Sequence, residues 1–168
     1  MAMHSNILVA VTVLSATVLV ATVSSLKASE SREAFEGVWK TVEVVVPGQT
    51  PQTFRAAATL AIFHGKHYSR VEVHTEGARP ALKDPATASA DELRAVWGPF
   101  VAEAGTSEVA GNNVVTMRAM VAKNPAAMTN GATSAYTYQL NGDTLTLTQT
   151  RTPSGPAAPV MIKLVRVE

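Results

Sequence analysis

Along most of this chain, beyond residue 35, β-branched and other apolar residues alternate with polar ones. A two-residue period of this kind is typical of strands that bury one face, and clusters of Gly, Pro and Asn separate one such segment from the next. The strongest turn signal is Asn141-Gly142, which favours a type I′ hairpin. The pattern predicts strands at residues 36–46, 53–63, 67–75, 106–110, 113–123, 132–140, 143–148 and 160–167.

One segment between the third and fourth of these strands has a helical period instead. Ser89 and Glu92 stand at the spacing of a capping box, so we predict a helix over residues 89–104 that stops at Gly105. Pro99 removes one backbone hydrogen bond and predicts a kink or a break at the residue before it. The apolar stripe of this helix is made by Leu93, Trp97, Phe100, Val101 and Ala104.

Eight strands joined mostly as consecutive hairpins predict an all-β domain, an up-and-down antiparallel barrel with a single helical excursion. Closure into a barrel removes the exposed strand edges and leaves an interior just large enough for side chains or one small ligand. The helix is expected to cover one opening of the barrel. An open sheet curled around the helix is the alternative architecture.

The short turn after the second strand indicates which side chains share a face. A two-residue loop at 64–65 or 65–66 pairs residues of opposite parity, and we take the face that carries Leu60 and Ile62 as the interior. A three-residue loop would reverse the assignment. The interior face then continues through His67, Ser69, Val71 and Val73, while Tyr68, Arg70, Glu72 and His74 face solvent.

The first 28 residues are read as a targeting segment rather than as part of the fold. Residues 7–26 carry no charge, and small residues precede Ser29, as in a secretory signal peptide that is removed during export. The same apolar stretch is long enough for a retained membrane anchor, which is the alternative. In either case the domain, residues 35–168 after a polar linker at 29–34, lies outside the cytoplasm, in the periplasm or secreted.

Composition excludes several classes of function. From residue 29 onward 13 basic residues balance 13 acidic ones, since Lys27 is the one charged residue before that point, and a neutral domain without a basic block is a poor binder of nucleic acid. The chain has no cysteine, so it forms no disulfide, thiolate metal site or cysteine nucleophile. No cofactor is expected.

No motif in the sequence points to one reaction. There is no G-x-S-x-G nucleophile elbow. His64, His67 and His74 do not form a metal site in this reading, because one lies in a turn and the other two on opposite faces of a strand. Glu72 and Glu108 are read as solvated strand residues rather than as a catalytic pair. The chain is therefore expected to be a binding protein more readily than an enzyme.

The candidate ligand-binding residues are those that could line the barrel or its mouth. The Asn141-Gly142 hairpin pairs Tyr138 with Leu145 and Tyr136 with Leu147, which puts both tyrosines on one apolar face. The aromatic residues either line a pocket or fill the core, and Arg118 lies on the outer face or anchors an anionic group inside. The candidates are Trp97, Phe100, Tyr136, Tyr138, His67, Ser69 and Arg118.

Several motifs of the chain occur together in one family. They are F-E-G-V-W at 35–39, Y-S at 68–69, R-P at 79–80, S-A-D-E-L-R-A-V-W-G-P-F-V-A-E-A-G-T at 89–106, A-K-N-P at 122–125, Y-x-L-N-G-D-T-L-T-L-T at 138–148 and L-V-R-V-E at 164–168. Through them residues 35–168 resemble the bacterial lipocalin-like domain family. The resemblance implies an eight-stranded calycin-type barrel in which Trp39 closes one end beneath Arg166 as a structural plug. Ser107 departs from the family pattern, which tends to have an aromatic there.

The sequence thus predicts an exported lipocalin-like barrel, monomeric or weakly self-associating, that binds a small, mostly apolar molecule without transforming it. A cofactor-free cyclase or isomerase that uses the barrel cavity is the alternative from another class. A purely structural envelope domain is a third. Contact with a membrane is expected only through residues 7–26, if they are retained.

Overall fold

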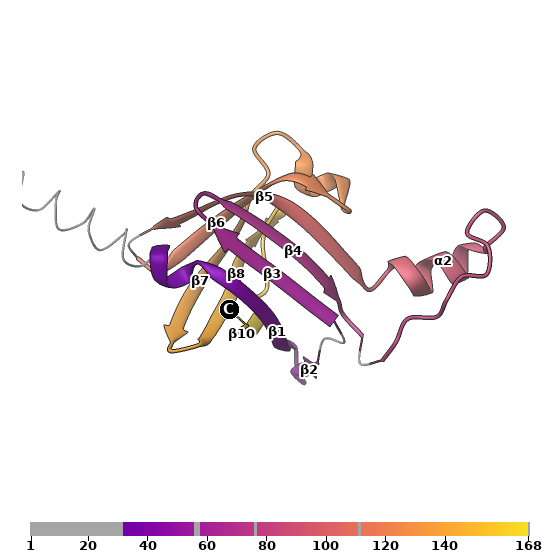
Figure 1. Ribbon diagram of the computed structural model, residues 1–168, viewed down its shortest axis with the longest axis horizontal. Helices are drawn as coiled ribbons and strands as arrows, with labels where there is room; N and C mark the ends of the chain where they lie inside the picture. Colours follow the sequence, from indigo (N-terminus) through magenta and orange to yellow (C-terminus); the bar gives the residue numbers. More distant parts are fainter. Residues whose placement is uncertain (1–31, 56–57, 76, 111, 168) are drawn as a thin grey trace, which may run out of the picture.

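The computed structural model describes residues 32–55, 58–75, 77–110 and 112–167. The predicted targeting segment, residues 1–28, lies outside these described residues. Within them, the chain forms a closed, all-antiparallel, up-and-down barrel (Figure 1). Strand β10 pairs with both β1 and β8, and these two pairings close the ring. The eight barrel strands are β1 (Gly37–Val46), β3 (Ala58–His64), β4 (His67–Val73), β5 (Phe100–Ala110), β6 (Val114–Ala122), β7 (Ser134–Asn141), β8 (Thr144–Thr152) and β10 (Met161–Arg166).

The predicted number of barrel strands and their antiparallel order are confirmed, and the differences lie in where strands begin and end. The segment predicted at 53–63 is divided between β3 and a short strand β2 (Gln52–Phe54), which pairs with the end of β1. A second short strand, β9 (Gly155–Pro156), pairs with the end of β8. These additions lengthen the wall of the barrel at one end without changing its topology.

The predicted helix is correct in its first half and wrong in its second. Helix α2 spans Ala90–Trp97, and its capping box is formed: the Ser89 hydroxyl accepts from the Glu92 amide at 3.3 Å, while the Glu92 carboxylate accepts from the Ser89 amide at 2.8 Å. The helix ends before Pro99, and the following residues enter β5. Gly105 is therefore a strand residue, and a Cβ atom there would lie 2.0 Å from the carbonyl oxygen of Arg118 on β6.

Helix α2 does not cover the barrel. No residue of the helix is buried, and it extends away from the strands on a long connection between β4 and β5 (Figure 1). Its attachment is at its C-terminal end, where the Trp97 ring packs edge-on against Phe100 at 5.8 Å. Lys123 at the end of β6 donates to the backbone carbonyls of Trp97 and Phe100, the latter at 2.8 Å. The helix is thus fixed at its base, and apart from the half-buried Leu93 and Val96 its residues are exposed.

The two ends of the barrel differ. At the closed end, where β1 begins and β10 ends, residues 32–35 form a helical turn and Phe35 packs against Phe63 and Tyr138 at 4.5 and 5.2 Å. The Arg166 guanidinium lies 4.2 Å from the centre of the fully buried Trp39 ring, the contact that the family resemblance implied. We call the opposite end, where β1, β4, β6 and β8 end, the open end.

The face of the β3–β4 hairpin predicted to be interior is the outer one. The loop is Gly65-Lys66 and residues pair with the expected parity, so Leu60 faces the same side as Val71. Both are exposed, at 45% and 43%, whereas Tyr68 is 4% and Glu72 1% exposed. Packing of Tyr68 against Phe63 and pairing of Arg70 with Glu103 on β5 hold the other face inside. Tyr68, Arg70 and Glu72 therefore point into the barrel.

The Asn141-Gly142 hairpin also differs in register from the prediction. Asn141 pairs with Thr144 within the ladder, so the turn residues are Gly142 and Asp143, and only Gly142 of these has a positive φ, at 56°. The two strands are consequently shifted by two residues, and Tyr138 lies opposite Leu147 rather than Leu145. A shift of two keeps every side chain on its face, so both tyrosines remain buried beside the leucines.

Candidate functional site at the open end

Three charged side chains lie inside the barrel on neighbouring strands. Arg70 and Glu72 alternate along β4, and Glu103 lies opposite Arg70 on β5. The Arg70 Nη2 atom is 3.3 Å from Glu103 Oε1, and its Nε atom is 4.0 Å from Glu72 Oε2. Their side chains are 15%, 13% and 1% exposed for Arg70, Glu103 and Glu72. Buried charges persist in proteins where they are paired in this way.

Glu72 is held by two further groups. Its Oε1 atom accepts from the Thr41 hydroxyl at 3.1 Å, and its Oε2 atom lies 2.6 Å from Nε2 of His74, the residue that follows the end of β4. Burial by itself raises the pKa of Glu72, but Arg70, the His74 contact and the Thr41 hydrogen bond outweigh it, so the pKa lies below its ordinary value. Glu72 is therefore a carboxylate at neutral pH.

The phenol and guanidinium groups around this carboxylate are also perturbed. Burial raises the pKa of Tyr68 well above its ordinary value, and the nearby Glu103 carboxylate raises it further. For Arg70, burial lowers the pKa, yet Tyr136, Glu72 and Glu103 together raise it above its ordinary value. The Tyr136 hydroxyl in turn accepts from Nε2 of Gln149 at 3.3 Å. Arg70 is thus permanently charged and Tyr68 neutral.

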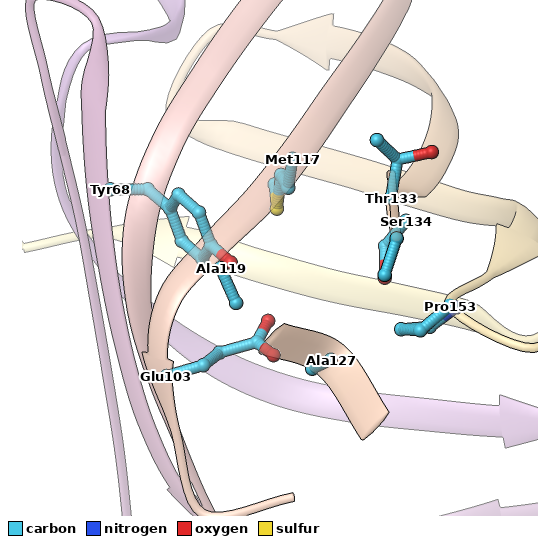
Figure 2. Close-up of a pocket in the computed structure, with 9 residues that line it drawn as sticks. Tyr68, Glu103, Met117, Ala119, Ala127, Thr133, Ser134 and Pro153 are labelled. Atoms are coloured by element: carbon cyan, nitrogen blue, oxygen red, sulfur yellow. The ribbon is translucent and has the colours of Figure 1, made fainter. Parts of the chain in front are cut away.

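The middle of the barrel is filled by these side chains. Figure 2 shows the Tyr68 hydroxyl and the Glu103 carboxylate directed toward the same crevice, which is bounded by Ala127 of the 3₁₀ turn η1 (Pro125–Met128) and by Ser134. The crevice is too narrow to admit a water-sized sphere. A ligand of appreciable size consequently has no room at this position.

Space for a ligand lies nearer the rim of the open end. A hollow of about 220 Å³ is lined by Val44, Val46, Phe54 and His74. The first three residues are apolar and come from the paired ends of β1 and β2. The His74 side chain is 36% exposed and joins the hollow to the buried Glu72 carboxylate. The hollow is therefore apolar on its walls with one polar group on its inner side.

The structure separates the predicted site residues into two groups. Tyr136 and Tyr138 are buried inside the barrel, at 1% and 6% exposure. The other five candidates do not lie inside the barrel, because the strand face that carried them is the outer one or because the helix does not fold over the mouth; for Arg118 this is the first of the two predicted positions. Trp97 is 49% exposed on α2, Phe100 is half-buried at the start of β5, and His67, Ser69 and Arg118 lie on the outer face of the barrel.

Sequence reasoning missed Arg70, Glu72 and His74. The available signal was their alternation in R-V-E-V-H, which puts all three on one face of a strand. A face with three ionisable groups is normally the solvated one, and the partner of Arg70, Glu103, lies on a strand 33 residues later in the chain. Glu108, once considered as a partner of Glu72, is exposed near the closed end.

The remaining histidines do not join His74. His64 lies at the β3–β4 turn with its side chain 90% exposed, 3.6 Å from Glu36, and His67 is exposed beside it. Within the described ranges, no three His, Asp or Glu side chains converge so as to hold a metal ion. Nor does this part of the chain contain a helix of the length and hydropathy needed to cross a bilayer.

Comparison with known proteins gave no match: no family model, no curated protein and no solved structure is significantly similar to this chain.

The lowered pKa of Glu72 predicts a specific loss of stability in acid. A carboxylate whose folded-state pKa lies below its unfolded-state pKa stabilises the fold above the unfolded value, and this contribution is lost as the pH falls through the folded value. Urea unfolding of the wild type from pH 7 to pH 3 should therefore show a steeper decline in unfolding free energy than the Glu72→Gln variant. Parallel declines for the two proteins would contradict the assignment of Glu72 as a buried carboxylate.

Proposed function

We propose that this chain is an exported member of the bacterial lipocalin-like domain family and binds a small, mostly apolar molecule at the open end of its barrel without transforming it. The closed eight-stranded barrel supports the family resemblance of residues 35–168. The observation that carries the function is the hollow lined by Val44, Val46, Phe54 and His74. Its apolar walls can pack against the apolar part of a ligand, and His74 can form a hydrogen bond with one polar group of that ligand.

The volume of the hollow limits the size of the ligand. Pockets for drug-sized ligands measure about 300–1,000 Å³, whereas a cavity of about 150 Å³ accommodates benzene. At about 220 Å³, the hollow fits a molecule of one ring or a short branched chain. The ligand of this proposal is therefore small, with a hydroxyl, carbonyl or carboxylate group placed toward His74.

Native mass spectrometry of the protein purified from its own host tests this proposal. We expect a fraction of the protein to carry a non-covalent adduct. The adduct should disappear in Val46→Asp, which puts a charge against the hollow, and persist in Val121→Asp, which makes the same change on β6 outside it. Protein that is ligand-free in every preparation, or adducts that survive equally in both variants, would refute binding in the hollow.

The Glu72–His74 pair favours one second candidate, proton transfer on the bound molecule. A buried carboxylate 2.6 Å from Nε2 orients the imidazole, as the partner of a general base does. Incubation of the identified ligand with the protein in D₂O distinguishes the candidates. Incorporation of deuterium into the carbon skeleton of the ligand by the wild type, but not by His74→Ala, would establish an isomerase-type activity. If no deuterium is incorporated, binding is the function.

A further inference from the structure

Exposed apolar side chains are unevenly distributed between the two ends of the barrel. Within the described part of the chain, ten large apolar side chains are at least one-third exposed, and six of them lie at or beside the open end. Leu60, Ile62 and Val71 lie on the outer face of β3 and β4, and Val167 lies at the closed end. Trp97, Met120 and Val121 are the most exposed of the six, at 49%, 69% and 62%. We call the six the apolar rim: Val46, Phe54, Trp97, Met120, Val121 and Met128.

These residues come from separate elements that meet at one end. Val46 and Phe54 belong to the ends of β1 and β2, Met120 and Val121 to the end of β6, and Met128 to the turn η1 that follows. Trp97 is the last residue of α2, next to the start of β5. The rim thus surrounds the entrance to the barrel, where several exposed apolar groups together mark an interaction site.

Basic residues are also more numerous than acidic ones at the open end. Around the open end the outer surface carries six basic residues (Arg55, Arg79, Lys83, Arg94, Lys123 and Arg151) against Asp84, Asp91 and Glu92, an excess of 6 − 3 = 3. Around the closed end Arg32, Lys40, Lys66 and Arg166 balance Glu33, Glu36, Glu108 and Asp143. The open end is both the apolar end and the basic end.

We propose that the open end docks on the surface of an anionic lipid bilayer. Apolar side chains surrounded by basic ones complement such a surface, where the chains insert at the headgroup boundary and the cations meet lipid phosphates. Trp97 is the type of side chain enriched at this depth. The contact is distinct from any anchoring by residues 7–26 and does not depend on the ligand, although it would bring the hollow next to the lipid phase.

Tryptophan fluorescence tests the docking at the rim itself. The chain has two tryptophans, and Trp39 is fully buried at the other end. Protein recovered after expression of the full chain is titrated with vesicles of phosphatidylcholine and phosphatidylglycerol, with and without brominated acyl chains. We expect a blue shift of the emission and quenching by bromine in the wild type, and neither in Trp97→Phe. If vesicles leave the emission of the wild type unchanged, the proposal is wrong. The same holds if the protein binds vesicles through residues 7–26 but its emission does not change.

A pair of charge variants separates the open end from the closed end. Removal of one basic residue near an anionic surface weakens binding about fivefold, so Lys83→Gln/Arg151→Gln should lower vesicle affinity about 25-fold. Lys40→Gln/Lys66→Gln makes the same change in net charge at the closed end and should leave the affinity within about twofold. Equal losses of vesicle affinity in the two double variants would refute docking by the open end. A blue-shifted Trp97 emission caused by self-association without lipid would also refute it.

Discussion

Replacement of Arg70 by methionine is expected to lower the free energy of unfolding by about 3–5 kcal/mol at pH 7, because it leaves Glu72 and Glu103 buried without their counter-ion. Urea unfolding followed by circular dichroism measures this change. The deficit should shrink as the pH falls toward 4, since protonation of the uncompensated carboxylates removes the unfavourable buried charge.

Arg118→Met is the matched control for this prediction. It makes the same chemical change on the outer face of β6, where Arg118 is exposed, and should alter stability by less than about 0.5 kcal/mol. A second variant, Arg70→Met/Glu103→Leu, removes one of the two uncompensated carboxylates and should recover part of the loss. If the two single variants lose equal stability, Arg70 does not neutralise buried carboxylates and the interior network described here is wrong.

Replacement of Trp39 by alanine should be comparably severe, with a loss of about 3–5 kcal/mol. The ring is fully buried, its Nε1 atom donates to the Phe35 carbonyl at 3.2 Å, and its face supports the Arg166 guanidinium at 4.2 Å. Arg166 also donates to the Ala34 carbonyl at 2.7 Å, so loss of the ring loosens the helical turn that closes this end. Thermal and urea unfolding measure the effect.

The other tryptophan provides the control. Trp97→Ala removes the same atoms from a half-exposed position on α2, and we expect a loss of no more than about 1 kcal/mol. Trp39→Phe should fall between the two, because it keeps an aromatic face beneath Arg166. A Trp39→Ala variant as stable as Trp97→Ala would show that the closed end does not depend on this ring.

Some features of the fold could be predicted from the sequence and others could not. The strand count, the antiparallel order and the start of α2 followed from local signals: the two-residue period, the turns rich in Gly and Asn, and the Ser89–Glu92 capping box. The length of the helix was misjudged because Phe100 and Val101 fit a helical stripe as well as a strand. Pro99 decided between them, and the wall of the barrel takes up the residues that follow.

The candidate site was largely beyond the reach of the sequence. The alternation of side chains along the strand correctly placed Arg70, Glu72 and His74 on one face. Because all three are ionisable, that face was predicted to be exposed to solvent. Their burial depends on Glu103 from β5 and on Thr41 from β1, which lie about 30 residues away along the chain in either direction. No local pattern carries that information.

By itself, the sequence determined that this chain forms strands of a given number and order, because periodicity, caps and turn residues act over a few neighbouring positions. Only the tertiary structure decided which face of β3 and β4 is inside, where α2 ends and which opening is apolar. Those features depend on contacts between distant segments, such as Phe35 with Phe63 and Arg70 with Glu103. The barrel was therefore predictable from its strands, whereas the interior charges and the apolar rim emerge only when the ring closes.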